Sequence, residues 1–249
     1  MLRELLQIYD ASRTNPGKPE CTFAETLIFN EGWLLRGVLK EWQSWTQPAR
    51  FGFLPFPERS KVYSEAQLYT PFKARFRGDK LAEAHTHVDG IVGHFQIVGT
   101  KSGAALAPDW RYLAVFEAKM YSPLSSRAMH APGYDQVSRT AACMIHAILE
   151  SEDTGDHIAH LVVLYPADNV KIHPARYTRD CVEKRIAARV RTYLASGKPG
   201  KPTARFFDEW RTVLPRIQVQ FLTWEDVLAE IDSEELDQFY ALCTRFNHP

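Results

Sequence analysis

The sequence predicts an α/β fold in which a mixed central β-sheet is flanked by helices, with extra helices toward the C-terminus. Two segments in the first half, 62–71 and 86–98, have the alternation or the β-branched residues of strands. Residues 158–165 form an unbroken apolar run, which suits a strand covered on both faces. Segments with helical periodicity lie between and after these runs, and strands that alternate with helices are typical of a sheet covered by helices.

Chain length and composition fit one domain. A chain of 249 residues, 45% of them hydrophobic, can bury a single large core. We expect one domain over residues 1–249, with a core at about 23–165 and a C-terminal elaboration of helices and a strand at 166–249. No apolar run approaches the roughly 18 residues of a membrane-spanning helix, and the start of the chain lacks a secretory signal. We therefore expect a cytoplasmic protein without a membrane partner.

The first elements are a helix and a strand separated by a connector. Residues 23–45 place apolar side chains at helical spacing without an intervening proline, so they predict a helix. Residues 48–59 are rich in proline and should form a connector. Residues 62–71 alternate polar and apolar side chains, as a strand with one buried face does.

The next two strands are expected to pair. Residues 86–98 should form a strand that turns or bulges at Gly90 and Gly93. A loop of Gly, Ala and Pro follows at about 102–109, and residues 112–120 predict the second strand. We expect the two strands to form a hairpin.

The remaining elements alternate between helix and strand. A loop at 122–133 precedes a helix at 134–150, whose apolar residues lie on one face, and the strand at 158–165 follows. The further elements that we expect are helices at 177–194 and 204–214, a strand at 218–223, and helices at 224–231 and 233–246.

Charge is unevenly distributed along the chain although the net charge is zero. Between Lys171 and Arg205 there are ten Lys or Arg against only two acidic residues, and from residue 206 onward nine acidic residues face three arginines. The basic helix at 177–194, with Arg179, Arg185 and Arg189, is therefore a candidate for contacting nucleic-acid phosphates. The alternative is an ordinary solvated helix face.

The segment at 115–119 carries the clearest chemical signal. Side chains alternate on a strand, so Glu117 and Lys119 share one face while Phe116 and Ala118 point to the other. The preceding residues are apolar enough for an inner strand, where a charge without a partner is costly. An ion pair on an edge strand is the alternative reading of this pattern.

A second acid lies on the strand that we expect beside this one. Asp89 precedes Gly90, which allows the backbone to approach a ligand closely. If the two strands pair, Asp89 and Glu117 converge, and two converging carboxylates repel unless a cation lies between them. Oxygen ligands favour a hard cation, Mg²⁺ or Mn²⁺. Such an ion polarises a phosphodiester, and Lys119 beside it can position the attacking water.

The order of Asp89, Glu117-Ala118-Lys119 and a following helix with Gln136 resembles the PD-(D/E)XK nuclease superfamily. This resemblance implies a restriction-endonuclease-like fold. It differs from the family pattern where Val88, and not proline, precedes Asp89.

The resemblance also implies roles for individual residues. Asp89, Glu117 and the backbone carbonyl of Ala118 would be the metal ligands, Lys119 would position the water, and Gln136 would orient the site. Many members carry a further acid on the first helix, which corresponds to Glu31 here. Glu65 also precedes the Asp89 strand, so either acid is a candidate for this auxiliary position.

The function implied is that of a Mg²⁺-dependent or Mn²⁺-dependent endonuclease or exonuclease, in a defence or repair system. Nucleic acid is the expected partner, with DNA favoured over RNA, and a homodimer is compatible with the family. No G-x-x-x-x-G-K-[ST] motif is present, so an ATPase or helicase activity would come from another chain.

Two other functions compete with this interpretation. A catalytically silent nucleic-acid-binding subunit of a larger assembly would keep the fold without turnover. A zinc amidohydrolase would use His85 and His87, which lie two apart and share a face of a strand. In amidohydrolases this motif lies at the end of the first strand of a (β/α)₈ barrel, and a whole barrel takes about 250 residues. Only 160 residues follow Asp89, which is too few for the rest of such a barrel.

Overall fold

The computed structural model describes residues 2–13, 24–44, 50–51, 54–55, 57–99, 102–125, 127–128, 131–151, 155, 157, 159–199 and 203–248. Among these residues, seven strands form one mixed sheet in the order β11-β10-β7-β4-β3-β6-β5. Their bounds are β3 (Lys61–Tyr69), β4 (His85–Gly93), β5 (Phe95–Val98), β6 (Gly103–Leu106), β7 (Leu113–Ala118), β10 (Ala159–Tyr165) and β11 (Ile217–Thr223). Strand β10 runs parallel to β7 and β11, and β4 runs antiparallel to β3 and β7. The predicted α/β class with a mixed sheet is confirmed.

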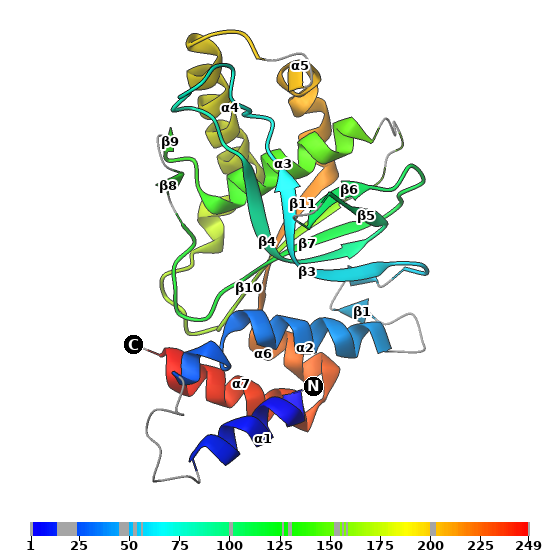
Figure 1. The fold of residues 1–249 in the computed structure, drawn as a ribbon, viewed down its shortest axis with the longest axis vertical. Helices are drawn as coiled ribbons and strands as arrows, with labels where there is room; N and C mark the ends of the chain where they lie inside the picture. The colour runs from blue at the N-terminus through cyan, green and yellow to red at the C-terminus, as the bar shows by residue number, and fades with distance from the viewer. Residues whose placement is uncertain are drawn as a thin grey trace.

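Helices cover the sheet in two layers, which are seen above and below it in Figure 1. The upper layer contains α3 (Gln136–Glu150), α4 (Arg179–Ala195) and α5 (Ala204–Val213). The lower layer contains α1 (Leu2–Arg13), α2 (Glu31–Ser44), α6 (Trp224–Ile231) and α7 (Glu234–Asn247), so both ends of the described chain lie there. The described 3-10 helices are η2 (Glu25–Leu27), η3 (Pro174–Tyr177) and η5 (Leu214–Arg216). Two short antiparallel pairs lie outside the main sheet: β1 (Arg50–Phe51) with β2 (Leu54–Pro55), and β8 (Arg127–Ala128) with β9 (Ala131–Pro132).

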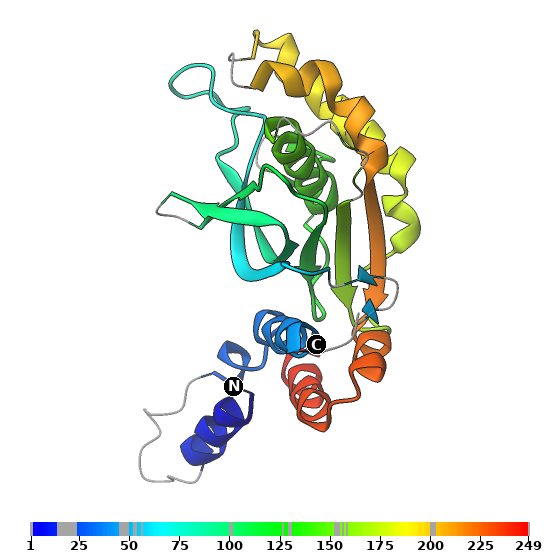
Figure 2. The ribbon, with the colours of Figure 1, turned by 90° about the vertical axis from the view of Figure 1, so that its right-hand side faces the viewer.

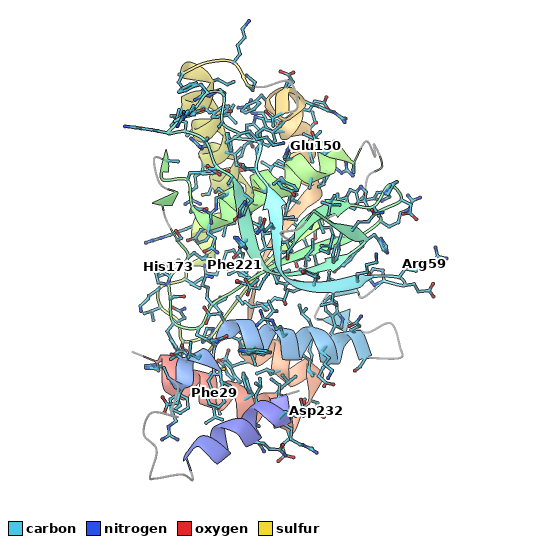
Figure 3. All side chains as sticks on the ribbon, in the orientation of Figure 1. Phe29, Arg59, Glu150, His173, Phe221 and Asp232 are labelled. Atoms are coloured by element: carbon cyan, nitrogen blue, oxygen red, sulfur yellow. The ribbon has the colours of Figure 1, made fainter. Side chains whose placement is uncertain are left out.

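Two hydrophobic cores result, one on each side of the sheet. Strand β7 illustrates the division, because Val115 belongs to the core under α3 and Phe116 to the core over α2. All six residues of β7 are buried. In Figure 3, Phe29 marks the lower core, where its ring packs 5.3 Å from that of Phe239. The alternation along β7 therefore fixes which side chains reach the α3 side of the sheet, and Glu117 is one of them.

The segment after residue 165 contributes to both cores. Val213 and Ile217 pack in the core under α3, whereas Trp224 and Phe239 pack in the other one. No helix in the described part of the chain has the length and apolar character needed to cross a membrane.

Local details can be compared with the predictions for the segment 86–109 and the N-terminus. The expected turn at Gly93 is present and separates β4 from β5, because Gly93 adopts φ 139, where a Cβ would lie 2.2 Å from the Tyr112 carbonyl oxygen. The expected loop at 102–109 contains β6, which pairs with β5, so β4 and β7 are antiparallel neighbours without forming a simple hairpin. Helix α1 was not anticipated.

Candidate active site

Glu117 lies on a central strand and is fully buried. It is next to the C-terminal end of β7, between β4 and β10 in the sheet. Its carboxylate has no exposure to solvent. A buried carboxylate needs hydrogen-bond donors or a cation to be tolerated.

Asp89 lies beside Glu117 on the antiparallel neighbour. Gly90 of β4 pairs with Phe116 of β7, so the next position in the same register places Asp89 opposite Glu117. The Asp89 carboxylate accepts a hydrogen bond of 2.7 Å from the backbone N–H of Ala118. The two acids of the predicted site are therefore brought together by the sheet register.

Lys119 follows β7 directly and is mostly buried. Its Nζ lies 3.8 Å from Asp89 Oδ2 and donates a 2.9 Å hydrogen bond to the Ala118 carbonyl oxygen. The backbone of Lys119 is held on both sides, because its N–H donates to Leu164 and its carbonyl accepts from the Trp224 indole at 2.9 Å. The ammonium group is thus fixed close to both candidate ligands.

Helix α3 supplies two donors to Glu117. Gln136 Nε2 donates to Glu117 Oε2 at 2.5 Å, and Thr140 Oγ1 donates to Oε1 at 2.7 Å. Asp135 starts the helix as its N-cap by accepting from Ser138 N–H at 2.8 Å. Residues four apart share a helix face, so this start presents Gln136 and Thr140 together to the sheet.

The environment of the Glu117 carboxyl group raises its pKa above the ordinary value. Burial and then the charge of Asp89 raise the pKa of Glu117 to about 7, while Lys119, the Thr140 hydrogen bond and Arg139 act in the opposite direction. Burial disfavours the ionised carboxylate because it removes hydration. A bound cation would relieve this cost.

The Thr140 hydrogen bond gives a direct test of this environment. Thr140→Val removes a donor that favours the charged carboxylate, so the pKa of Glu117 should rise further above about 7. The measurement is a carboxyl-carbon NMR titration of the metal-free protein. Ser138→Ala, on the same helix turn, is the matched control and should leave the titration unchanged. An unchanged pKa in Thr140→Val would remove Thr140 from the site.

Neither auxiliary acid joins the pair. Glu31, the first residue of α2, lies near Cys243 of α7 and contributes to raising the pKa of that thiol. Glu65 is opposite Asp89 in the β3–β4 register, but its half-exposed carboxylate pairs with Arg36 at 3.3 Å. Glu65 adopts φ 57, which is unusual for a residue other than glycine and marks a local distortion of β3.

The donor set for a metal is consequently small. Among the described residues, no group of three or more His, Cys, Asp or Glu side chains could hold an ion. Asp89, Glu117 and the Ala118 carbonyl remain as candidate oxygen ligands. This set fits Mg²⁺, which keeps several waters and uses one or two carboxylates together with substrate oxygens.

The histidine pair lies on β4 without completing a zinc site. His85 Nε2 and His87 Nε2 are 3.1 Å apart, and the Gln67 amide lies 3.5 Å from His87. The main described sheet is open, with β11 and β5 at its two edges, so the barrel that the amidohydrolase interpretation requires is not the architecture observed.

The three arginines of α4 that were candidates for contacting phosphates differ in exposure. Arg179 is exposed at the helix start, and Arg185 is partly exposed and pairs with Asp135 at 2.9 Å. Arg189 is buried, where it pairs with Glu83 at 2.9 Å and lies over the Phe72 ring. The expectation that Arg189 contacts phosphates therefore does not suit its position, because its guanidinium is committed to an internal ion pair.

A pocket of about 340 Å³ lies between the β9 region and α4, and Tyr134, Lys184 and Arg185 are among its lining residues. Arg185 also contacts Asp135, which adjoins Gln136. A cationic pocket is thus connected to the glutamate site by a short series of contacts.

Several site residues escaped the sequence analysis. Thr140 stands four residues after Gln136, and this helical spacing is a signal that could have identified it. Aspartate is a common N-cap residue, so the role of Asp135 at the start of α3 could have been recognised from the sequence. Its ion pair with Arg185 depends on tertiary structure. Nothing local indicates that Trp224 contacts Lys119, 105 residues earlier.

Comparison of the chain with protein-family models, curated proteins and solved structures found no match.

Proposed function

We propose that this protein is a divalent-metal-dependent nuclease that hydrolyses nucleic-acid phosphodiester bonds. The observation that carries the proposal is the arrangement around Glu117. A buried carboxylate with a pKa of about 7 faces a second acid on the adjacent strand, and a lysine lies next to both. This combination of residue types at a strand end supports a PD-(D/E)XK-type site.

Asp89, Glu117 and the Ala118 carbonyl would hold the metal ion. When bound, the ion supplies charge stabilisation at a phosphoryl oxygen and lowers the pKa of a water molecule. The hydrogen bonds to Glu117 leave lone pairs on its oxygens, since each carboxylate oxygen can accept more than one bond. The donor set therefore fits a hard cation.

The chain's own residues position the reactants. Lys119 Nζ carries the positive charge nearest to Asp89 and the Ala118 carbonyl, where it can orient a water and balance negative charge. Gln136 and Thr140 hold the Glu117 carboxylate in one orientation. Fixed donors of this kind reduce the reorganisation needed during reaction.

The cationic pocket supports an anionic substrate. Lys184 is exposed and Arg185 partly exposed at its lining. Two buried donors of lining residues, Tyr134 Oη and Arg189 Nη1, have no hydrogen-bond partner within the described structure. Buried polar atoms without partners are rare, and an acceptor-rich ligand near this wall is one way to satisfy them.

Cleavage assays with plasmid, single-stranded and duplex oligonucleotides test the proposal directly. Wild-type protein should cleave in Mg²⁺ or Mn²⁺ and lose activity in EDTA. Absence of cleavage of every substrate, with nucleic-acid binding retained, would instead support the silent binding subunit. That alternative is favoured by one observation, the lack of a third acidic side chain near Asp89 and Glu117 in the described residues.

Lys119→Ala separates metal binding from turnover. It leaves both carboxylates in place, so Mg²⁺ affinity measured by calorimetry should change little. The cleavage rate should fall by about a hundredfold or more, because the charge that positions the water is lost. Lys171→Ala, which removes another lysine bonded to a backbone carbonyl, is the control. Wild-type turnover by Lys119→Ala would contradict the assigned role.

A further inference from the structure

The segment between β3 and β4 projects beyond the sheet at the upper left of Figure 2. At its turn, Phe76 is 57% exposed, although large apolar side chains are ordinarily buried. We call residues 73–80 the projecting loop. An exposed aromatic ring alone needs no explanation, but this one is held on a rigid support.

The Asp79 carboxylate ties the projecting loop together. It accepts hydrogen bonds from the side chain of Arg75 at 2.7 and 2.8 Å and from the backbone N–H groups of Arg75 and Leu81. The hydrogen bond from Arg75 holds the pKa of Asp79 well below its ordinary value. Gly78, at φ 84, permits the tight turn between Phe76 and Asp79.

The projecting loop is also fixed to helix α4. The Arg75 guanidinium lies 4.1 Å from the centre of the Tyr193 ring and donates to Ser196 Oγ at 2.9 Å. These contacts hold the backbone on either side of Phe76, so its ring is presented without the entropy cost of ordering a flexible loop.

Three further cationic residues of the loop lie at exposed positions, while the Arg75 guanidinium lies 5.7 Å from the centre of the Phe76 ring. Lys73, Arg77 and Lys80 are all exposed, and none of them forms a salt bridge with another described residue. The only acid of the loop, Asp79, is already neutralised by Arg75. The loop therefore presents an exposed aromatic ring together with the cations of Arg77 and Lys80, whereas Lys73 lines a pocket with His146 and Glu150.

The position of the loop relates it to the candidate site. Arg75 contacts α4 at Tyr193, whereas Arg185 of the same helix contacts Asp135 beside Gln136. These two contacts lie eight positions apart on α4, which corresponds to about 12 Å along a helix. Helix α4 thus contacts both the projecting loop and the residue next to Gln136.

We propose that the projecting loop binds an unpaired base of a nucleic acid, with Phe76 stacking on the base through the ring face away from Arg75, and with Arg77 and Lys80 contacting the backbone phosphates. Aromatic stacking combined with cations is the mode by which proteins hold single strands without reading sequence. The inference deepens the proposed nuclease function, because it names a substrate with a single-stranded region. A blunt duplex offers no free base face to Phe76.

The test measures binding in EDTA, where no metal-dependent cleavage occurs. Fluorescence anisotropy at several salt concentrations compares a labelled single-stranded oligonucleotide with a blunt duplex. Phe76→Ala should weaken single-strand binding roughly fivefold to a hundredfold, without changing the dependence of affinity on salt. Phe76→Tyr should retain affinity, and Val170→Ala, which alters another exposed apolar residue, should have no effect.

The charged residues provide a second, independent readout. Arg77→Ala with Lys80→Ala should reduce the slope of log affinity against log salt by about 1.4 for a single strand. Unchanged single-strand affinity in Phe76→Ala would overturn the proposal. So would an equal loss for the blunt duplex, or tighter binding of the loop to anionic lipid vesicles than to the oligonucleotide.

The binding result is distinguishable from failure of the nuclease proposal. A protein that binds single strands through Phe76 but cleaves nothing in Mg²⁺ would sustain this inference and reject the enzyme. Cleavage in Mg²⁺, with single-strand binding unaffected by Phe76→Ala, would support the enzyme and reject this inference.

Discussion

Replacing Glu117 by glutamine should abolish metal-dependent cleavage and, in the metal-free protein above neutral pH, increase stability. Glutamine keeps an oxygen that can accept the Thr140 hydrogen bond, and its NH2 group can donate to the Gln136 side chain once the Gln136 amide turns its oxygen toward it. It removes the charge that a divalent cation requires. The cleavage rate should therefore fall by more than about a hundredfold, the upper range seen when only the supporting residues of a metal site are changed.

The stability gain follows from the raised pKa of Glu117. The folded-state pKa is about 7, above the ordinary value of 4.5, so the native protein binds more protons than the unfolded chain between these values. Stability is consequently lost as the pH rises through this window, and the full penalty is present above about pH 7. A shift of this size corresponds to about 3 kcal/mol. Glu117→Gln avoids the penalty.

Urea unfolding in EDTA at pH 5 and pH 8 measures this effect. Wild type and Glu117→Gln should differ little at pH 5 and most at pH 8, and added Mg²⁺ should stabilise only wild type. Glu58→Gln, a change at an exposed acid, is the control for loss of charge alone. A Glu117→Gln protein that cleaves normally, or that is less stable than wild type at pH 8, would contradict the assignment.

Arg189→Ala should destabilise the fold by about 3–5 kcal/mol, whereas Arg185→Ala should cost about 1 kcal/mol or less. The Arg189 side chain is 2% exposed and pairs with Glu83, whose side chain is 12% exposed, so its removal vacates a buried position over the Phe72 ring and leaves a largely desolvated carboxylate without its cation. Arg185 is 27% exposed, and its partner Asp135 keeps its role at the start of α3.

Denaturant midpoints and binding assays together separate the two arginines. Arg185→Ala should reduce the salt dependence of nucleic-acid binding while unfolding at nearly the wild-type denaturant concentration. Equal stability losses for the two variants would show that burial does not distinguish their roles. A double variant would mix both effects and obscure the binding contribution.

The sequence was informative where chemistry and periodicity coincide. The alternation at Glu117 and Lys119 predicted a shared face, and the apolar run before them predicted an inner strand, which β7 is. Asp89 could be placed beside Glu117 because pairing of the two strands was expected. The helices at 134–150 and 224–231 were predicted close to their observed bounds because their apolar residues follow helical spacing.

Other features depend on distant residues and could not be read locally. The small residues at 103–106 give no strand signal of their own, and β6 exists because β5 pairs with it. The basic character of α4 did not reveal which arginine turns inward, since Glu83, the partner of Arg189, is 106 residues earlier. The family resemblance likewise suggested Glu31 as an auxiliary acid, and this role of the first residue of α2 stays a prediction.

The hydrogen bond from Trp224 to the Lys119 carbonyl has a consequence for synthesis of the protein. A growing chain has completed β7 and α3 well before it reaches α6, so Glu117, Gln136 and Thr140 exist while the backbone of Lys119 still lacks one of its supports. Strand β11, which immediately precedes Trp224, is also made late. The candidate site therefore lacks these supports until α6 has been synthesised. If the proposed nuclease function holds, such an order delays catalytic competence until the helices on both faces of the sheet are in place.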